Sequence, residues 1–208
     1  MKLIIFIVCT MFVSISNLAA QQVPTSWHFD TDTVGKIAQG FTNEEGEWKV
    51  VADDTAFSAP NVLAQMARNS GSTFNMTLHD ESYDKDGEVS VMMKSVSGEE
   101  DQGGGIVWRA RDANNYYIAR YNPLEDNYRV YKVVNGKRIQ LQSARIKHSD
   151  GWHLLQVKMI GECIECYYDK KKYLEITDKT FQGPGKVGLW TKADAVTYFD
   201  DLVVQEIK

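Results

Sequence analysis

The protein has 208 residues, of which 43% are hydrophobic and 25% are charged, and this length suits a single domain with a sizeable core. Its formal net charge is −5 and its pI is about 5.4. Proteins that bind nucleic acid without sequence preference carry a basic surface, so this acidic balance argues against that class and leaves room only for a local basic patch.

The first 20 residues, MKLIIFIVCTMFVSISNLAA, have the layout of a secretory signal peptide. Lys2 precedes an apolar run that ends at about Val13, and small residues stand before an expected cleavage after Ala20. The run is too short for a transmembrane helix, which needs about 20 apolar residues. We therefore expect an exported protein, periplasmic or extracellular, with one domain over residues 21–208.

Short β-branched and aromatic segments recur along this domain, separated by Gly, Asn, Asp and Pro. No window of a dozen residues keeps a helical period. Many short strands at regular spacing predict an all-β sandwich or barrel. The predicted strands are 46–52, 61–67, 73–78, 88–96, 105–111, 116–121, 128–134, 138–146, 152–160, 163–168, 172–177, 186–190 and 196–207.

Two cysteines, Cys163 and Cys166, lie in the segment GECIECYYD. A redox CxxC pair needs a helix N-terminus, and a zinc site needs further Cys or His ligands. The aromatic and β-branched neighbours instead predict a strand, in which residues three apart point to opposite faces and lie about 10 Å apart. We therefore predict free thiols, with Cys166 buried beside Ile164 and Tyr168 and Cys163 near a turn.

The segment 105–133 holds four arginines and five tyrosines. A hairpin loop at 112–115 would place Arg109 opposite Ile118, and a second loop at 122–127 would place Arg120 opposite Arg129. The strand pairings set by the two loops agree, because both assign the charged residues to one polar face and the uncharged residues to one apolar core face. The polar face would carry Arg109, Arg111, Tyr116, Arg120, Arg129 and Tyr131.

Two interpretations of this polar face remain open. The arginines could solvate a sheet, lying over aromatic rings and pairing with surface acids. Alternatively, guanidinium groups could bind hydroxyls or carboxylates while tyrosine rings stack on sugars. Arg120 and Arg129 repel each other unless an acid or an anionic ligand lies between them, which favours a binding platform. Trp190 and Lys192 would extend the platform, although a tryptophan in a sandwich is more often a core residue.

The segments 96–137, 150–181 and 185–204, which include GIVWRARDANNYYIARYNPLEDNYRVYKV, DGWHLLQVKMIGECIECYYD and GKVGLWTKADAVTYFDDLVV, resemble a secreted bacterial family of concanavalin-A-like, laminin-G-like jelly rolls. The resemblance covers nearly all of residues 21–208. It implies two curved antiparallel sheets, of which the concave one commonly handles carbohydrate. Family 16 glycoside hydrolases and 3-keto-disaccharide hydrolase domains are related, so the resemblance leaves binding and catalysis both open.

A retaining or inverting glycosidase needs two carboxylates about 5 to 10 Å apart. The family 16 pattern Glu-x-Asp-x-x-Glu is absent, and the acidic clusters such as Glu99, Glu100 and Asp101 are typical of solvated turns. A glycan-binding domain without catalytic residues is therefore the main hypothesis, with a polysaccharide or oligosaccharide as the partner. The alternatives are a sugar-degrading enzyme, indicated by a buried carboxylate or histidine at the floor of the site, and an adhesive module for cell-surface proteins, indicated by an exposed aromatic patch.

Aspartates near both ends of the domain suggest a metal site. Asp30 and Asp32 would meet Asp200 and Asp201 if the terminal strands pair, as they do in many jelly rolls. Ca²⁺ takes six to eight oxygen ligands, which carboxylates and carbonyls could supply there. The alternative is that these aspartates cap turns and protect an edge strand.

Overall fold

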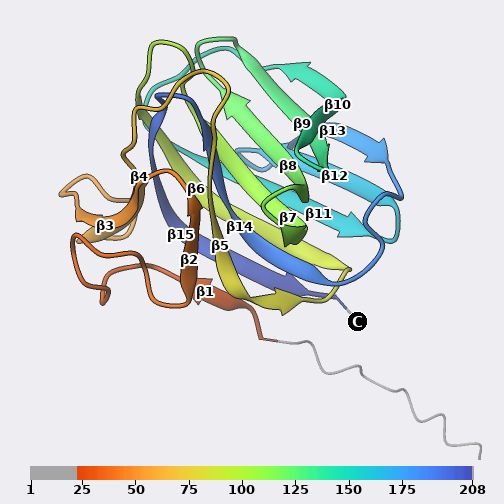
Figure 1. Ribbon diagram of the computed structural model, residues 1–208, viewed down its shortest axis with the longest axis horizontal. Helices are drawn as coiled ribbons and strands as arrows, with labels where there is room; N and C mark the ends of the chain where they lie inside the picture. Colours follow the sequence, from red (N-terminus) through yellow and green to blue (C-terminus); the bar gives the residue numbers. More distant parts are fainter. Residues whose placement is uncertain (1–22, 208) are drawn as a thin grey trace, which may run out of the picture.

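A computed structural model describes residues 23–207 (Figure 1). This part contains fifteen β-strands and no α-helix, and each of the thirteen predicted segments overlaps a strand, so the all-β class is confirmed. The sequence pattern does not reveal β1 (Thr25–Trp27) and β2 (Phe41–Glu45), because both are short and mostly exposed and so show no alternation of burial. The signal peptide predicted at residues 1–20 lies outside the described residues. Within residues 23–207 no helix is long and apolar enough to cross a membrane.

The strands form two antiparallel sheets packed face to face, which is the predicted jelly-roll sandwich (Figure 1). The terminal strands β1 and β15 lie side by side, as expected. Sheet A has the order β13 (Lys171–Thr177), β12 (Cys163–Tyr168), β11 (Trp152–Ile160), β6 (Gly87–Ser97), β15 (Val196–Glu206), β4 (Asn61–Gln65) and β3 (Trp48–Ala52), with β1 beside β15. Sheet B has the order β10 (Lys137–Arg145), β9 (Asn127–Val134), β8 (Asn115–Asn122), β7 (Gly104–Asp112), β14 (Gly185–Lys192), β5 (Phe74–Tyr83) and β2.

The main hydrophobic core lies between the sheets. It joins Trp108 and Tyr117 of sheet B to Val91 and Cys166 of sheet A. Cys166 is buried, Cys163 is exposed, and both are free thiols, as predicted. Burial raises the pKa of the Cys166 thiol, so this side chain is an uncharged core residue.

A second hydrophobic cluster lies on the outer face of sheet B, away from sheet A. It draws only on β5, β7, β8, β9 and β14. Its buried members are Met76, Leu78, Val107, Ala110, Tyr116, Ile118, Tyr131, Val133 and Trp190. The outer face of sheet B is therefore not uniformly polar, because aromatic and aliphatic side chains form a floor beneath its charged residues.

The register of sheet B confirms one predicted hairpin and corrects the other. Arg120 lies opposite Arg129, as predicted. In the first hairpin the register shifts between Trp108 and Asp112, so that Ile118 lies opposite Val107 and the predicted pairing with Arg109 is wrong. Arg109 sits in this bulge with a positive φ of 46°. A bulge reverses the direction of the side chains that follow it, and this removes the adjacent arginines from the outer face.

Candidate functional site

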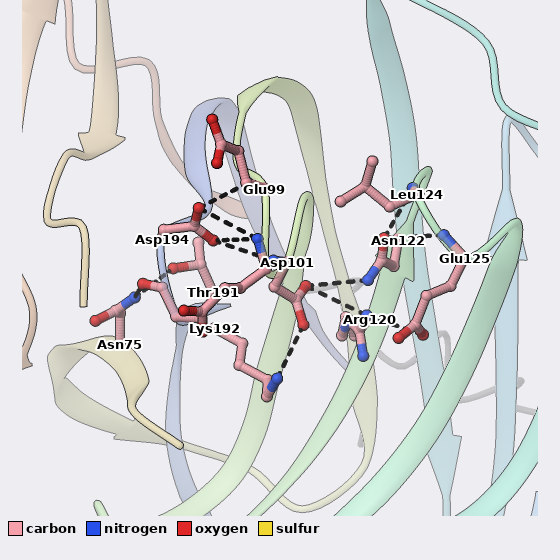
Figure 2. A network of polar contacts seen from close by, with 12 residues as sticks. Asn75, Glu99, Asp101, Arg120, Asn122, Leu124, Glu125, Thr191, Lys192 and Asp194 are labelled. Atoms are coloured by element: carbon pink, nitrogen blue, oxygen red, sulfur yellow. Dashed lines mark hydrogen bonds and ion pairs between the residues drawn. The ribbon is translucent and has the colours of Figure 1, made fainter. Parts of the chain in front are cut away.

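Five charged side chains of alternating sign cross the outer face of sheet B, and Figure 2 labels four of them, Lys192, Asp101, Arg120 and Glu125. Lys192 Nζ lies 3.3 Å from Asp101 Oδ2, and Asp101 Oδ1 lies 3.3 Å from Arg120 Nη2. The same Arg120 nitrogen lies 3.3 Å from Glu125 Oε2, which is 3.0 Å from Arg129 Nη1. We call these five residues the charge chain. The Glu125 carboxylate contacts both Arg120 and Arg129, and it therefore offsets the repulsion expected between these two paired arginines.

The charge chain has a buried centre and an accessible rim. The side chains of Arg120 and Asp101 are each 2% exposed, whereas those of Glu125, Arg129 and Lys192 are 47%, 31% and 20% exposed. A buried ion pair fixes geometry, while partly exposed charges remain free to exchange water for a ligand. The rim residues are therefore the ones that can contact a bound molecule first.

The loop between β6 and β7 places Asp101 at the centre. The Asp194 carboxylate accepts hydrogen bonds from three successive backbone N–H groups, those of Glu99, Glu100 and Asp101, at 2.6 to 3.1 Å (Figure 2). Gly103 then turns the chain into β7 with a positive φ of 108°, a conformation that favours glycine. The expectation that Asp101 is a solvated turn residue is thus wrong, because its loop is tied down and turns its carboxylate inward.

The turn between β8 and β9 places Glu125 in a similar way. Asn122 Oδ1 accepts hydrogen bonds from the backbone N–H groups of Leu124 and Glu125 at 2.9 and 3.3 Å. Its Nδ2 donates to Asp101 Oδ1 at 3.0 Å, so one asparagine links both acidic residues (Figure 2). Asn127 Nδ2 donates to the Glu125 carboxylate at 2.8 Å. The side chain of Glu125 is thereby oriented before any ligand arrives.

The surroundings shift the pKa values of the two carboxylates in opposite directions. Burial raises the pKa of Asp101, although Arg120 and Lys192 oppose the rise. Burial acts in the same direction at Glu125, but the hydrogen bond from Asn127 and the charge of Arg120 outweigh it and lower the pKa. Of the pair, Asp101 is the carboxylate that takes up a proton more readily.

The predicted aromatic residues lie beneath the charged ones. Tyr116 and Trp190 are 0% exposed, and the indole Nε1 donates to the Tyr116 hydroxyl at 3.1 Å. Tyr131 is 5% exposed and is covered by Arg138, whose guanidinium carbon lies 4.6 Å from the ring centre. These rings form the floor of the outer face and do not present free surfaces for stacking on a sugar.

Two predicted arginines are absent from the charge chain. Arg109 donates to the carbonyl oxygens of Lys85, Phe181 and Gly161 at 2.7 to 3.0 Å at one end of the sandwich. Arg111 is exposed, and its guanidinium carbon lies 5.3 Å from the ring centre of Phe181, a residue of the core between the sheets. Of the eight predicted site residues, six lie on the outer face of sheet B: Tyr116, Arg120, Arg129, Tyr131, Trp190 and Lys192.

The two pairs of aspartates in the predicted calcium site, Asp200 with Asp201 and Asp30 with Asp32, have different partners. Asp200 and Asp201 both accept hydrogen bonds from Ser58, and Asp201 also contacts His28. Asp30 and Asp32 instead accept hydrogen bonds from backbone N–H groups, those of Asn61 and Gln39. Among residues 23–207 no group of three or more His, Cys, Asp or Glu side chains is arranged to hold a metal. Calcium binding stays a prediction, which thermal melting with Ca²⁺ or with a chelator would test.

Three side chains away from the charge chain have the composition of a catalytic triad. His153 Nδ1 lies 2.9 Å from Asp169 Oδ2, and its Nε2 lies 3.1 Å from Ser149 Oγ. The same Nε2 also lies 3.1 Å from the carbonyl oxygen of Ser149, which can only accept a hydrogen bond. A general base needs a lone pair directed at the nucleophile, so this arrangement is better suited to fixing the loop than to activating Ser149.

No protein-family model matches the chain, and no curated protein matches its sequence. The fold is similar to the carbohydrate binding module CBM66 from Bacillus subtilis, with a TM-score of 0.68 and 19% identity over 80% of this chain and 96% of that one. It is also similar to a beta-glucanase from Bacillus licheniformis, with a TM-score of 0.61 and 13% identity over 89% of this chain and 98% of that one. A Bacillus subtilis protein of unknown function with a galectin-like fold has a TM-score of 0.61 and 11% identity over 80% and 89% of the two chains. The likeness is one of fold: the chain has the jelly-roll sandwich that these structures share.

Proposed function

We propose that the protein is an exported glycan-binding domain that binds a polysaccharide or oligosaccharide on the outer face of sheet B. The charge chain is the observation that carries this proposal, because it offers oriented donors at Arg129 and Lys192 and an oriented acceptor at Glu125. Sugar hydroxyls both donate and accept, so alternating acidic and basic side chains suit adjacent hydroxyl groups. The structural likeness to a carbohydrate binding module supports the proposal at the level of fold.

An adhesive protein-binding module has less support. Among the described residues, the large hydrophobic side chains that are exposed are Val23, Val34, Phe57, Val96, Leu124, Ile139 and Ile160. They come from separate loops and strands, and only one of them is aromatic. Protein-binding hot spots instead concentrate aromatic side chains in one patch.

Binding of the purified protein to a panel of neutral and acidic polysaccharides, measured by affinity electrophoresis with and without calcium, tests the proposal. Arg129→Ala and Lys192→Ala should each weaken binding by about tenfold, the usual effect of losing a charged hydrogen bond of about 1.5 kcal/mol. Lys172→Ala is the matched control, because Lys172 forms its ion pairs with Glu165 and Glu175 on sheet A. Equal affinity of all three variants would contradict the site, and retention of no polysaccharide would contradict the function.

Arg120 is unsuitable for this test because it is 2% exposed and holds Asp101 in place. Its truncation would alter the fold and the site together. Only the rim residues separate loss of binding from loss of structure.

A second candidate function, cleavage of a glycosidic bond, is favoured by the buried carboxylate of Asp101. Asp101 Oδ1 and Glu125 Oε2 each lie 3.3 Å from the same Arg120 nitrogen, so they are at most twice that distance apart. Two carboxylates at such a separation, with pKa values shifted apart, are the arrangement that acid and nucleophile require. However, Lys192, Arg120 and Asn122 occupy both oxygens of Asp101, which hinders delivery of its proton.

Product analysis distinguishes the two candidates. Shortened glycans that disappear with both Asp101→Asn and Glu125→Gln would establish the enzyme. Intact glycans in every bound mixture would support the binding domain.

A further inference from the structure

A sixth charged residue, Arg138 of β10, lies on the same face as the charge chain. Its guanidinium carbon is 4.6 Å from the ring centre of Tyr131, 5.0 Å from that of Phe74 and 5.8 Å from that of Trp190. The aromatic floor therefore holds this guanidinium by cation–π contacts. Within residues 23–207 no carboxylate forms an ion pair with Arg138, although the charges of Arg120 and Asp101 act on it.

The charge chain and Arg138 together carry more positive than negative charge. Their cationic side chains are Lys192, Arg120, Arg129 and Arg138, and their carboxylates are Asp101 and Glu125. These four cations exceed the two carboxylates by two charges, and Arg138 is the one without an ion pair among the described residues, in a protein whose net charge is −5. The excess is local, and the rest of the molecule must be correspondingly more acidic.

Hydrogen-bond donors are also left over at this face. The buried atoms Arg120 Nε and Arg138 Nη1 have no hydrogen-bond partner among the described residues. Buried donors without an acceptor are rare in folded proteins, and those of a charged group are the most unfavourable. Arg120 is 2% exposed, whereas Arg138 is partly exposed, so Arg138 is the guanidinium that an acceptor from a ligand can reach. A negatively charged acceptor would also balance the excess charge, which a neutral hydroxyl cannot do.

We infer that the glycan bound at this face carries carboxylate groups, as a polymer of uronic acids does, and that Arg138 and Arg129 bind them. This inference rests on the proposed function. A guanidinium fork matches the two oxygens of a carboxylate and can form two parallel hydrogen bonds with it. Arg129 and Tyr131 lie two residues apart on β9, and Arg138 lies over the Tyr131 ring, so the two guanidinium groups lie close to the same residue. The exposed carboxylate of Glu125 remains available to sugar hydroxyls.

The test compares polygalacturonate with the same polymer after its carboxylates have been reduced to alcohols, using the full protein in isothermal titration calorimetry. Polygalacturonate should bind at least about tenfold more tightly than the reduced, uncharged polymer. The affinity for polygalacturonate should fall as the salt concentration is raised. Arg138→Gln should remove most of this difference, and Arg138→Lys, which keeps the charge but not the fork, should remove part of it. Arg111→Gln is the matched control, because it removes an exposed guanidinium from the same sheet but away from this face. Melting temperatures of all variants confirm that they are folded.

The outcomes separate this inference from the proposed function. Equal affinity for the native and reduced polymers would overturn the carboxylate assignment and leave glycan binding intact. Retention of dextran sulfate but not of polygalacturonate would overturn it in favour of sulfate esters. Retention of no polysaccharide at all, neutral or acidic, would overturn the proposed function itself. An equal loss of affinity in Arg111→Gln and Arg138→Gln would show that the loss comes from the change in net charge and not from a contact of Arg138. That result would also overturn the assignment.

Discussion

Substitution of Arg120 by methionine should destabilise the protein far more than the loss of an exposed member of the charge chain such as Arg129. The substitution leaves Asp101, which is 2% exposed, without its nearest guanidinium. Removing one partner of a buried ion pair costs about 3 to 5 kcal/mol, and the contacts of Asp101 with Lys192 and Asn122 place the expected loss near the lower end, at about 3 kcal/mol. For a domain of this length, that corresponds to a melting temperature lower by about 6 to 12 °C.

Urea unfolding followed by tryptophan fluorescence measures this loss, with Arg129→Met as the control. Arg129 is 31% exposed and pairs with an exposed carboxylate, so its loss should cost less than about 1 kcal/mol. The double variant Arg120→Met with Asp101→Asn should recover at least half of the lost stability, because it no longer buries an unpaired charge. The penalty should also shrink as the pH falls, since Asp101 then takes up a proton. Equal losses in Arg120→Met and Arg129→Met, or strict additivity in the double variant, would refute the reasoning.

Three further predictions concern the sheets themselves. Gly105→Ala should prevent folding or lower the melting temperature by more than 10 °C, because the added Cβ would lie 1.9 Å from the carbonyl oxygen of Ala119. The temperature follows from a shift of about 3 °C for each kcal/mol of lost stability. An unchanged melting curve would contradict this prediction. Tyr116→Phe should cost about 1 to 3 kcal/mol in urea unfolding, because it leaves the buried indole N–H of Trp190 without an acceptor. Burial raises the pKa of Asp200 to about 6. Between about pH 4 and pH 6 the folded state therefore holds a proton that the unfolded state has released. The free energy of unfolding should fall as the pH rises through this range, by up to about 1.4 kcal/mol per pH unit. Asp200→Asn should flatten that slope in unfolding curves measured at pH 4, 5, 6 and 7, and an unaltered slope would assign it to another group.

Alternation of polar and apolar residues was enough to predict most of the fold. It predicts thirteen of the fifteen strands. It also predicts that Arg120 lies opposite Arg129, because burial of one face of a sheet determines the register between its strands. It fails at β7, where the run WRARD alternates as a regular strand does but contains a bulge. A bulge depends on how neighbouring strands fit, and the sequence of one strand does not encode that fit. For this reason the alternation predicts the wrong face for Arg109 and Arg111.

The centre of the site was harder to predict than its rim. Asp101 stands in an acidic run, GEEDQGGG, that is typical of a solvated loop, and its burial depends on Asp194, which is 93 residues away. Glu125 lies in a turn whose sequence does carry a local signal, since an asparagine before proline often fixes the following backbone through its side chain. Arg138 could not be placed over Tyr131 without knowing that β10 pairs with β9.

The displaced Arg109 has a consequence for how the protein opens. Its guanidinium bonds to carbonyl oxygens in three connections, at Lys85, Gly161 and Phe181, and Asp86 joins the same group by accepting from the Gly161 N–H at 2.7 Å. One side chain therefore binds three connections that are distant in sequence, and none of them can detach alone without taking an acceptor from the buried Arg109 guanidinium. In hydrogen-exchange experiments the amides of these loops should exchange together, as one cooperative unit of local unfolding, and Arg109→Ala should divide that unit into independently fraying parts.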